Sequence, residues 1–341
     1  MDTRSYALKL NSKEAQLVFN KLARCYRIVA PITQEGKGRF SETSIVTYDE
    51  AHSFDEIEFS KPTFFSAKHE VFPIRETLFD MNHGVVKERN LNMKPTIVFL
   101  RSCDIHAMQV IDTHFLKDSE KQDYYYKRRR EKIKFFLMEC PESFENCYCV
   151  SLGTNKANDY AVFLRRAKDG YEALIKDGQL KEFFPQRTDS IEYPRFVKQN
   201  PRVVAVPEYI PVSIFENDVW KEYSQRCIAC GRCNTSCPTC TCFTIQDVSS
   251  EDALAYARRR IWSSCHVDKF SLLAGGYDFR VNYGERMRYK VLHKIRDFNL
   301  KNGRQMCVGC GRCDDVCPEY ISMFRSIDKI CNILKYSQEN G

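Results

Sequence analysis

The chain has 341 residues, 43% of them hydrophobic and 28% charged, which is enough for a packed core and for about two domains. Its net charge of +7 is modest for this length and does not by itself indicate a nucleic-acid-binding protein. No apolar run approaches the roughly 20 residues of a membrane span, and the N-terminal stretch MDTRSYALKLNSKE has no apolar signal-peptide core. We therefore expect a cytoplasmic protein without membrane contact.

Residues 1–210 have the pattern of an α/β domain. The stretch PTIVFL at 95–100 predicts a short buried strand, and IKFFLME at 133–139 predicts another. Between them, residues 104–116 carry apolar side chains at helical spacing, and Asp104 is placed to serve as the N-cap. Because a helix connects the two strands, we expect them to be parallel and adjacent in one sheet.

Two further predictions complete this domain. Residues 159–178 predict two antiparallel strands around a turn at 168–170, and RVVAVP at 202–207 predicts another strand. Pro207 and Pro211 then flank a short linker, so we place the domain boundary at residue 210.

Residues 211–341 are expected to form an α-helical domain. Apolar side chains recur at helical spacing in four stretches, at 213–226, 250–265, 285–298 and 320–336. Ser250 is the expected N-cap of the second stretch. The predicted fold class is therefore α+β, with an N-terminal α/β domain followed by a helical one.

The chain contains 17 cysteines, and a reducing cytoplasm disfavours disulfides, so clustered cysteines indicate metal ligands. Two runs share the spacing C-x2-C-x2-C-x3-C-P, which is the pattern of bacterial ferredoxins. The first run is Cys227, Cys230, Cys233 and Cys237, and the second run is Cys307, Cys310, Cys313 and Cys317. A zinc ribbon is the alternative, but zinc sites usually have two C-x2-C pairs.

The spacing also predicts how the ligands are shared. Three thiolates at i, i+3 and i+6 wrap one cluster, whereas the fourth points away and ligates the other cluster. The first [4Fe–4S] cluster would therefore take Cys227, Cys230, Cys233 and Cys317, and the second would take Cys307, Cys310, Cys313 and Cys237. The two runs must then meet in space despite the long segment between them.

Four cysteines outside the runs predict a third [4Fe–4S] cluster. Cys103 and Cys140 each follow one of the two parallel strands, so both lie at the carboxyl edge of the sheet, where ligands collect. Cys147 and Cys149 follow in one loop that could fold back over this edge. The alternatives are that all four are ordinary buried cysteines, or that Asp104 substitutes as a ligand. Near the first run, Cys240 and Cys242 are expected either to pack or to line the first cluster.

The segment 251–306 is basic, with 12 Lys and Arg residues against 6 Asp and Glu residues. A solvated helical face is one interpretation, and a docking face for an acidic partner is another. Aromatic residues nearby leave open a metal-dependent nucleic-acid binder, although their spacing fits helix packing better: Tyr277, Phe279, Tyr283 and Tyr289. Neither a G-x-G-x-x-G nor a G-x-x-x-x-G-K-[ST] motif is present, so no nucleotide site is expected.

Several of these motifs together resemble the iron–sulfur electron-transfer subunit of the anaerobic, dissimilatory-type sulfite reductase. They are CGRCNTSCPTCTCF, RRIWSSC, AGGYDFR, CVGCGRCDDVCPEY, RSCDIHAMQVID and ENCYCVSLGTN, and they span about residues 60 to 325. They also resemble related β subunits of cytoplasmic sulfhydrogenases. The C-terminal domain is similar to the α-helical type of dicluster ferredoxin.

The resemblance implies a three-subunit cytoplasmic enzyme in which this chain is a non-catalytic relay. A flavin subunit would oxidise NADH, this chain would pass on single electrons, and a sirohaem subunit would reduce sulfite to sulfide. The alternative is the β subunit of a cytoplasmic hydrogenase or sulfur reductase, which shares the same parts. The eight cysteines of the two runs match the ferredoxin motif without departure, and no nucleic-acid or membrane partner is implied.

Overall fold

The computed structural model describes residues 6–249 and 255–339. Packing divides the chain into two compact units, each assembled from three segments. The first unit comprises Met1–Ala67, Asn92–Phe144 and Gly153–Asn200. The second unit comprises Lys68–Leu91, Glu145–Leu152 and Pro201–Gly341. Both units contain helices and strands, so the fold is mixed α+β, as the sequence predicts. In the described residues, no helix is long and apolar enough to cross a membrane.

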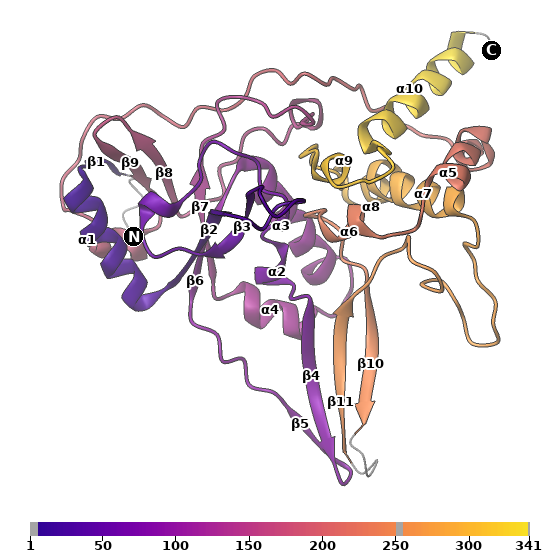
Figure 1. Cartoon of the computed structure of the whole chain (residues 1–341), viewed down its shortest axis with the longest axis horizontal. Coiled ribbons are helices and arrows are strands. Elements are labelled where there is room, and N and C mark those ends of the chain that lie inside the picture. The colour runs from indigo at the N-terminus through magenta and orange to yellow at the C-terminus, as the bar shows by residue number, and fades with distance from the viewer. Residues whose placement is uncertain (1–5, 250–254, 340–341) are drawn as a thin grey trace. The chain divides into compact units, whose positions relative to one another are not determined.

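A seven-stranded sheet forms the centre of the first unit (Figure 1). Its four middle strands are parallel and buried, whereas the outer pairings at both edges are antiparallel. The strand order is β1 (Tyr6–Leu10), β9 (Gly170–Ile175), β8 (Val162–Ala167), β7 (Ile133–Met138), β6 (Thr96–Leu100), β2 (Arg27–Gln34) and β3 (Ile45–Glu50). The predicted parallel pair β6–β7 and the antiparallel pair β8–β9 are confirmed.

Helices α1 (Ser12–Cys25), α3 (Ser102–Leu116) and α4 (Tyr124–Arg130) belong to this unit. A capping box formed by Asn11 and Glu14 begins α1. Short 3-10 turns at Phe54–Glu56 and Gly178–Phe183 complete the unit.

The N-cap prediction for α3 is wrong. The cap residue is Arg101, whose guanidinium donates hydrogen bonds to the carbonyls of Phe59 and Lys61, and the helix begins at Ser102. Asp104 therefore lies inside the first turn, fully buried, where its carboxylate is 3.4 Å from the hydroxyl of Tyr48.

The second unit contains a four-stranded antiparallel sheet of order β10 (Phe243–Ser249), β11 (Ala255–Trp262), β4 (Arg75–Asn82) and β5 (Val85–Glu88). The helix predicted for 250–265 is wrong, because residues 255–262 form β11; the expected cap Ser250 lies outside the described residues. Contacts with distant residues hold β11 extended. Arg260 forms a buried ion pair with Glu76 at 2.9 Å, and Trp262 stacks on Phe72.

The other predicted helical stretches of the second unit are helical. The longest helices are α7 (Tyr283–Leu292) and α10 (Met323–Glu339). A π-helical segment (His293–Asp297) and α8 (Phe298–Asn302) continue α7. The apolar side chains of Met287, Val291 and Ile295, at helical spacing in the predicted stretch 285–298, are buried. The shorter helices are α2 (Lys68–Val71), α5 (Lys221–Arg226), α6 (Arg232–Thr235) and α9 (Arg312–Asp315), with 3-10 turns at Val150–Leu152, Val212–Glu216 and Asp218–Trp220.

Residues 202–207 form no strand, contrary to prediction. Val204 is buried in the core of the second unit, and its N–H donates to the hydroxyl of Ser151 at 3.1 Å. Its backbone donor is thus satisfied by a side chain rather than by a neighbouring strand.

Candidate metal centres

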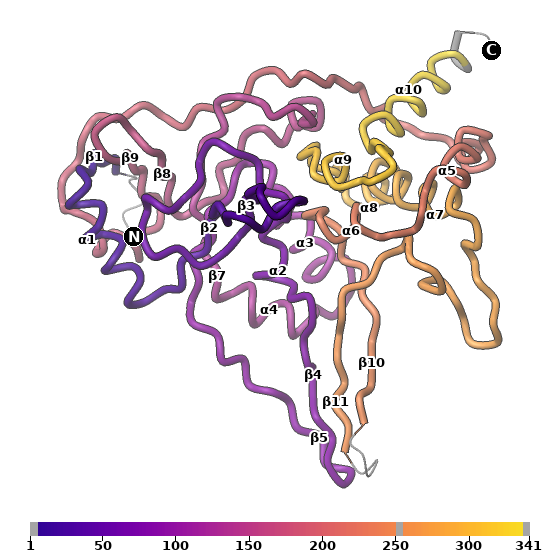
Figure 2. The backbone as a smooth tube through the Cα atoms, in the orientation of Figure 1, coloured from indigo at the N-terminus to yellow at the C-terminus, as the bar shows by residue number. Residues whose placement is uncertain are grey.

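The two cysteine runs adopt the same local structure. In each run a left-handed glycine, Gly231 or Gly311, precedes a single helical turn, α6 or α9. Two residues earlier the backbone also has positive φ, at Ala229 (+55°) and Gly309 (+64°). These turns curl each loop inward; the Ala229 N–H, for example, lies 3.4 Å from the Cys227 sulfur. Helices α6 and α9 lie side by side, so the two runs meet in space (Figure 2).

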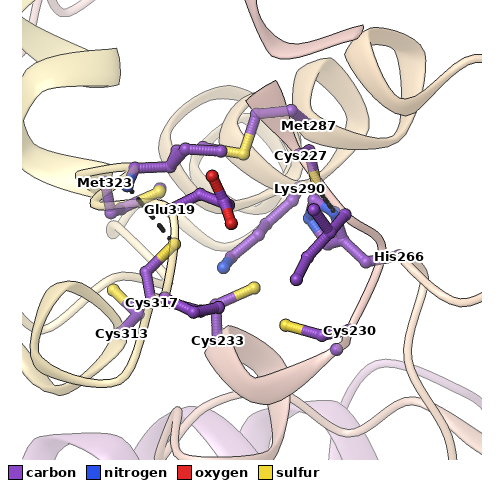
Figure 3. Close-up of a pocket in the computed structure, with 14 residues that line it drawn as sticks. Cys227, Cys230, Cys233, His266, Met287, Lys290, Cys313, Cys317, Glu319 and Met323 are labelled. Atoms are coloured by element: carbon purple, nitrogen blue, oxygen red, sulfur yellow. Dashed lines mark hydrogen bonds between the residues drawn. The ribbon is translucent and has the colours of Figure 1, made fainter. Parts of the chain in front are cut away.

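The first cavity is lined by the leading triplet of one run and the last cysteine of the other. Figure 3 shows Cys230, Cys233 and Cys317 with their sulfur atoms turned toward this space, and Cys227 also lines it. The sulfur of Cys317 accepts a hydrogen bond from the N–H of Ile321 at 3.3 Å. Backbone donors of this kind stabilise thiolate ligands.

The second cavity has the reciprocal lining. Cys307, Cys310 and Cys313 come from the second run and Cys237 from the first. Each cavity is thus lined by cysteines of both runs, and Cys313 lines both cavities. The crossed ligand sets stay a prediction. Thiolates in two groups of four are the donors that [4Fe–4S] clusters take in ferredoxins. Burial raises the pKa of Cys227 and Cys307, so these thiols favour the protonated form until a metal binds.

Part of the basic segment is internal. Arg260, Arg286, Lys290 and Lys294 are buried, which excludes a solvated face at these four positions. Lys290 lines both cavities and Lys294 lines the second. Burial lowers the pKa of Lys294, but the negative charge that Cys237, Cys240 and Cys307 carry as thiolates raises it by more.

His266 is a further cavity residue that the sequence did not single out. It lines the first cavity, and its Nδ1 lies 3.8 Å from the sulfur of Cys227. Burial, together with the charges of Lys290 and Arg286, lowers its pKa to about 3, so the ring is neutral. Its position directly after the motif RRIWSSC was the signal in the sequence that could have found it.

The segment Glu145–Leu152 packs on the second run. The backbone N–H of Tyr148 donates to the carbonyl of Gly309 at 2.9 Å, and the Tyr148 hydroxyl lies 3.2 Å from the Cys307 sulfur. In addition, the side chain of Asn146 donates to Asp315. This segment therefore closes over the loop that carries the second triplet.

The two cavities differ at equivalent motif positions. Ile228 is 55% exposed, whereas its counterpart Val308 is 2% exposed. Arg232 is exposed and Arg312 is buried. The same contrast holds after the fourth cysteine, where Pro318 and Tyr320 are exposed and their counterparts Pro238 and Cys240 are buried. The first cavity therefore lies near solvent, and the second lies inside the unit.

The four cysteines of the predicted third cluster are divided between the units. In the first unit, Cys103 is in the opening turn of α3 and Cys140 follows β7; because β6 and β7 are adjacent and parallel, both occupy the carboxyl edge of the sheet. In the second unit, Cys147 and Cys149 are buried, and the Cys147 sulfur lies 3.7 Å from the carbonyl of Cys310. The third ligand set stays a prediction.

The remaining cysteines near the runs take part in packing. Cys240 is buried, and its carbonyl accepts a hydrogen bond from the buried Lys68 at 2.8 Å. Cys242 is half-buried and in contact with Cys265, whose sulfur accepts from the side chain of Asn234 at 3.1 Å. Neither Cys240 nor Cys242 lines the first cavity.

Comparison with known proteins agrees with this geometry. Residues 226–321, which contain all eight cysteines of the two runs, match the 4Fe-4S dicluster domain family. The chain is therefore an iron–sulfur protein of the electron-transfer class. It is similar to subunit beta of sulfhydrogenase 2 from Pyrococcus furiosus, with 29% identity over 346 aligned positions that cover 95% of this chain and 98% of the relative. No solved structure matches significantly.

Proposed function

We propose that this chain is the electron-transfer subunit of a cytoplasmic hydrogenase or sulfur reductase complex. The observation that carries the proposal is the pair of adjacent cavities, each lined by the triplet of one run and the fourth cysteine of the other, with Cys313 lining both. The alignment with a sulfhydrogenase beta subunit over 95% of the chain supports the same assignment. It favours the hydrogenase or sulfur reductase interpretation of the motifs over the sulfite reductase one.

The chain's own residues would hold two clusters close together and shield them. When bound, a [4Fe–4S] cluster takes up and gives back single electrons. Cys313, Lys290 and Met323 line both cavities, so the two cavities share a wall. Buried neighbours such as Val308 and Tyr148 exclude water from the second cavity. Backbone N–H groups and buried lysines compensate the negative charge of the thiolates.

Exchange with a partner is assigned to the first cavity. Ile228 lines this cavity and is exposed. Arg232 and Tyr320, which neighbour lining residues in the chain, are exposed as well, whereas the counterparts of all three residues near the second cavity are buried. Tyr320 has positive φ (+52°), a conformation that costs free energy in a non-glycine residue and often marks a functional position. Arg226 fixes this turn by donating to the carbonyl of Glu319 at 3.0 Å.

A second candidate is the relay of a sulfite reductase, with a flavin subunit that oxidises NADH and a sirohaem subunit as partners. The motif resemblance across residues 60 to 325 favours it. In both candidate functions this chain transfers electrons between two partner subunits, and the candidates differ only in the terminal electron acceptor.

Cofactor analysis of the native complex tests the proposal. The tagged full-length chain is purified anaerobically with its partners, and the metals, flavin and sirohaem are measured. We expect nickel and flavin without sirohaem; sirohaem in stoichiometric amount would instead identify the sulfite reductase relay. The chain alone should exchange electrons with dithionite but turn over neither sulfite nor sulfur. Steady NADH-dependent sulfide production by the isolated chain would overturn the relay assignment.

A further inference from the structure

Lys290 occupies a position that no other basic side chain of the described residues shares. It lies on α7, is 4% exposed, and lines both cysteine cavities. Figure 3 shows its amine end directed into the first cavity, toward the thiols. Lys294, four residues further along, lines only the second cavity and donates to the hydroxyl of Thr239 at 2.8 Å.

The surroundings of Lys290 explain how a buried charge is tolerated there. An isolated buried ammonium is costly unless negative charge lies close to it. Cysteines of both predicted ligand sets stand around this side chain: Cys233 and Cys313 line the first cavity with Lys290, and Cys313 lines the second cavity with it. Cys233 belongs to the first ligand set and Cys313 to the second. One cation therefore faces negative charge from both sets.

We propose that Lys290 is a shared potential-setting residue, which raises the reduction potentials of both clusters together. Uptake of one electron from a single-electron donor adds one negative charge to a cluster, and a nearby fixed cation stabilises that reduced form. Because the same charge acts on both sites, it would raise both potentials without changing the difference between them. The inference rests on the proposed pair of clusters.

Redox titration of the reconstituted full chain tests this role without any partner. Lys290→Met removes the charge, Lys290→Gln removes it but keeps polarity, and Lys290→Arg retains it. Lys294→Met removes a cation from the second cavity only. Lys335→Met removes an exposed lysine on α10 and is the matched control. Iron content and the potentials of both centres, followed by electron paramagnetic resonance, are measured for each variant.

We expect the neutral Lys290 variants to bind both clusters and to shift both reduction equilibria toward the oxidised form by about tenfold, or about 59 mV for one electron. Lys294→Met should shift one centre, and Lys290→Arg and Lys335→Met should shift neither. If both neutral variants lose iron while Lys290→Arg retains it, the charge is required for cluster binding and the potential-setting role is overturned.

Two intact clusters with unchanged potentials in Lys290→Met, or a shift in one centre only, would overturn the shared role. Iron loss in all three Lys290 variants would show a packing role instead. Absence of clusters from the unaltered chain would refute the proposed function itself, so the two failures are distinguishable.

Discussion

The hydroxyl of Tyr148 lies 3.2 Å from the sulfur of Cys307, although 159 positions separate the two residues in the chain. Tyr148 is fully buried, and its backbone is tied to Gly309. When Cys307 is a thiolate ligand, the phenol is the donor of this hydrogen bond. A donor to a cluster thiolate stabilises the reduced form of the cluster.

Tyr148→Phe should therefore lower the potential of the centre in the second cavity while both clusters remain bound. One hydrogen bond contributes about 1 kcal/mol, which corresponds to roughly 40 mV for one electron. Tyr223→Phe is the matched control, because this buried tyrosine donates to Ser326 at 3.0 Å and lines neither cavity. An unchanged potential in Tyr148→Phe, or an equal shift in Tyr223→Phe, would show that the contact has no electronic role.

Close packing of segment 145–152 on the second run predicts a sharp effect of Gly309→Ala. A Cβ at Gly309 would lie 2.7 Å from the backbone of Tyr148 and Cys149, and the backbone there has φ of +64°. Gly303 has nearly the same φ (+65°), but a Cβ there meets nothing within 4 Å. Gly303→Ala therefore isolates the conformational penalty from the steric one.

We expect Gly309→Ala to lose iron from the second cavity and Gly303→Ala to keep both clusters. Iron analysis and resonance spectra of the two purified variants check this. Full iron content in Gly309→Ala would mean that the segment moves aside freely and does not hold the loop.

The third cluster that the sequence predicts, with Cys103, Cys140, Cys147 and Cys149 as its ligands, would set the iron content of the whole chain. We expect about twelve iron atoms per chain, about four for each of three clusters. Cys103→Ser should lower this to about eight, whereas Cys25→Ser, which changes an exposed cysteine of the same unit, should not. If the fully loaded chain holds only about eight iron atoms, and Cys103→Ser leaves that number unchanged, these four cysteines are ordinary packing residues and not cluster ligands.

The helices, strands and motifs that could be predicted are those whose residue pattern lies within one continuous stretch of the sequence. Strands β6 and β7 are short apolar runs joined by a helical stretch, so both their pairing and the edge position of Cys103 and Cys140 followed from chain order. The two cysteine runs could be recognised in the same way, because three predicted ligands of each cluster lie within seven residues and a proline follows the fourth cysteine.

The predictions that failed concern residues whose conformation depends on partners far along the chain. Residues 255–262 have helical periodicity, yet they form β11 because Arg260 pairs with Glu76, 184 positions away. Tertiary contacts of this kind override local propensity. The positions of Lys290 and Tyr148 beside the cavities also could not be predicted from the sequence, because these positions arise only where separate segments of the chain meet.

The crossed pair of clusters is the central claim, and a four-variant comparison tests it most directly. Cys230→Ser and Cys310→Ser alter the middle cysteine of each triplet, so their resonance spectra define loss or change of the first and second centre respectively. The account predicts that the spectrum of Cys317→Ser matches that of Cys230→Ser, and that Cys237→Ser matches Cys310→Ser, because the fourth cysteine of each run lines the other cavity. If Cys317→Ser instead reproduced the spectrum of Cys310→Ser, each run would hold its own cluster and the crossed arrangement would be wrong.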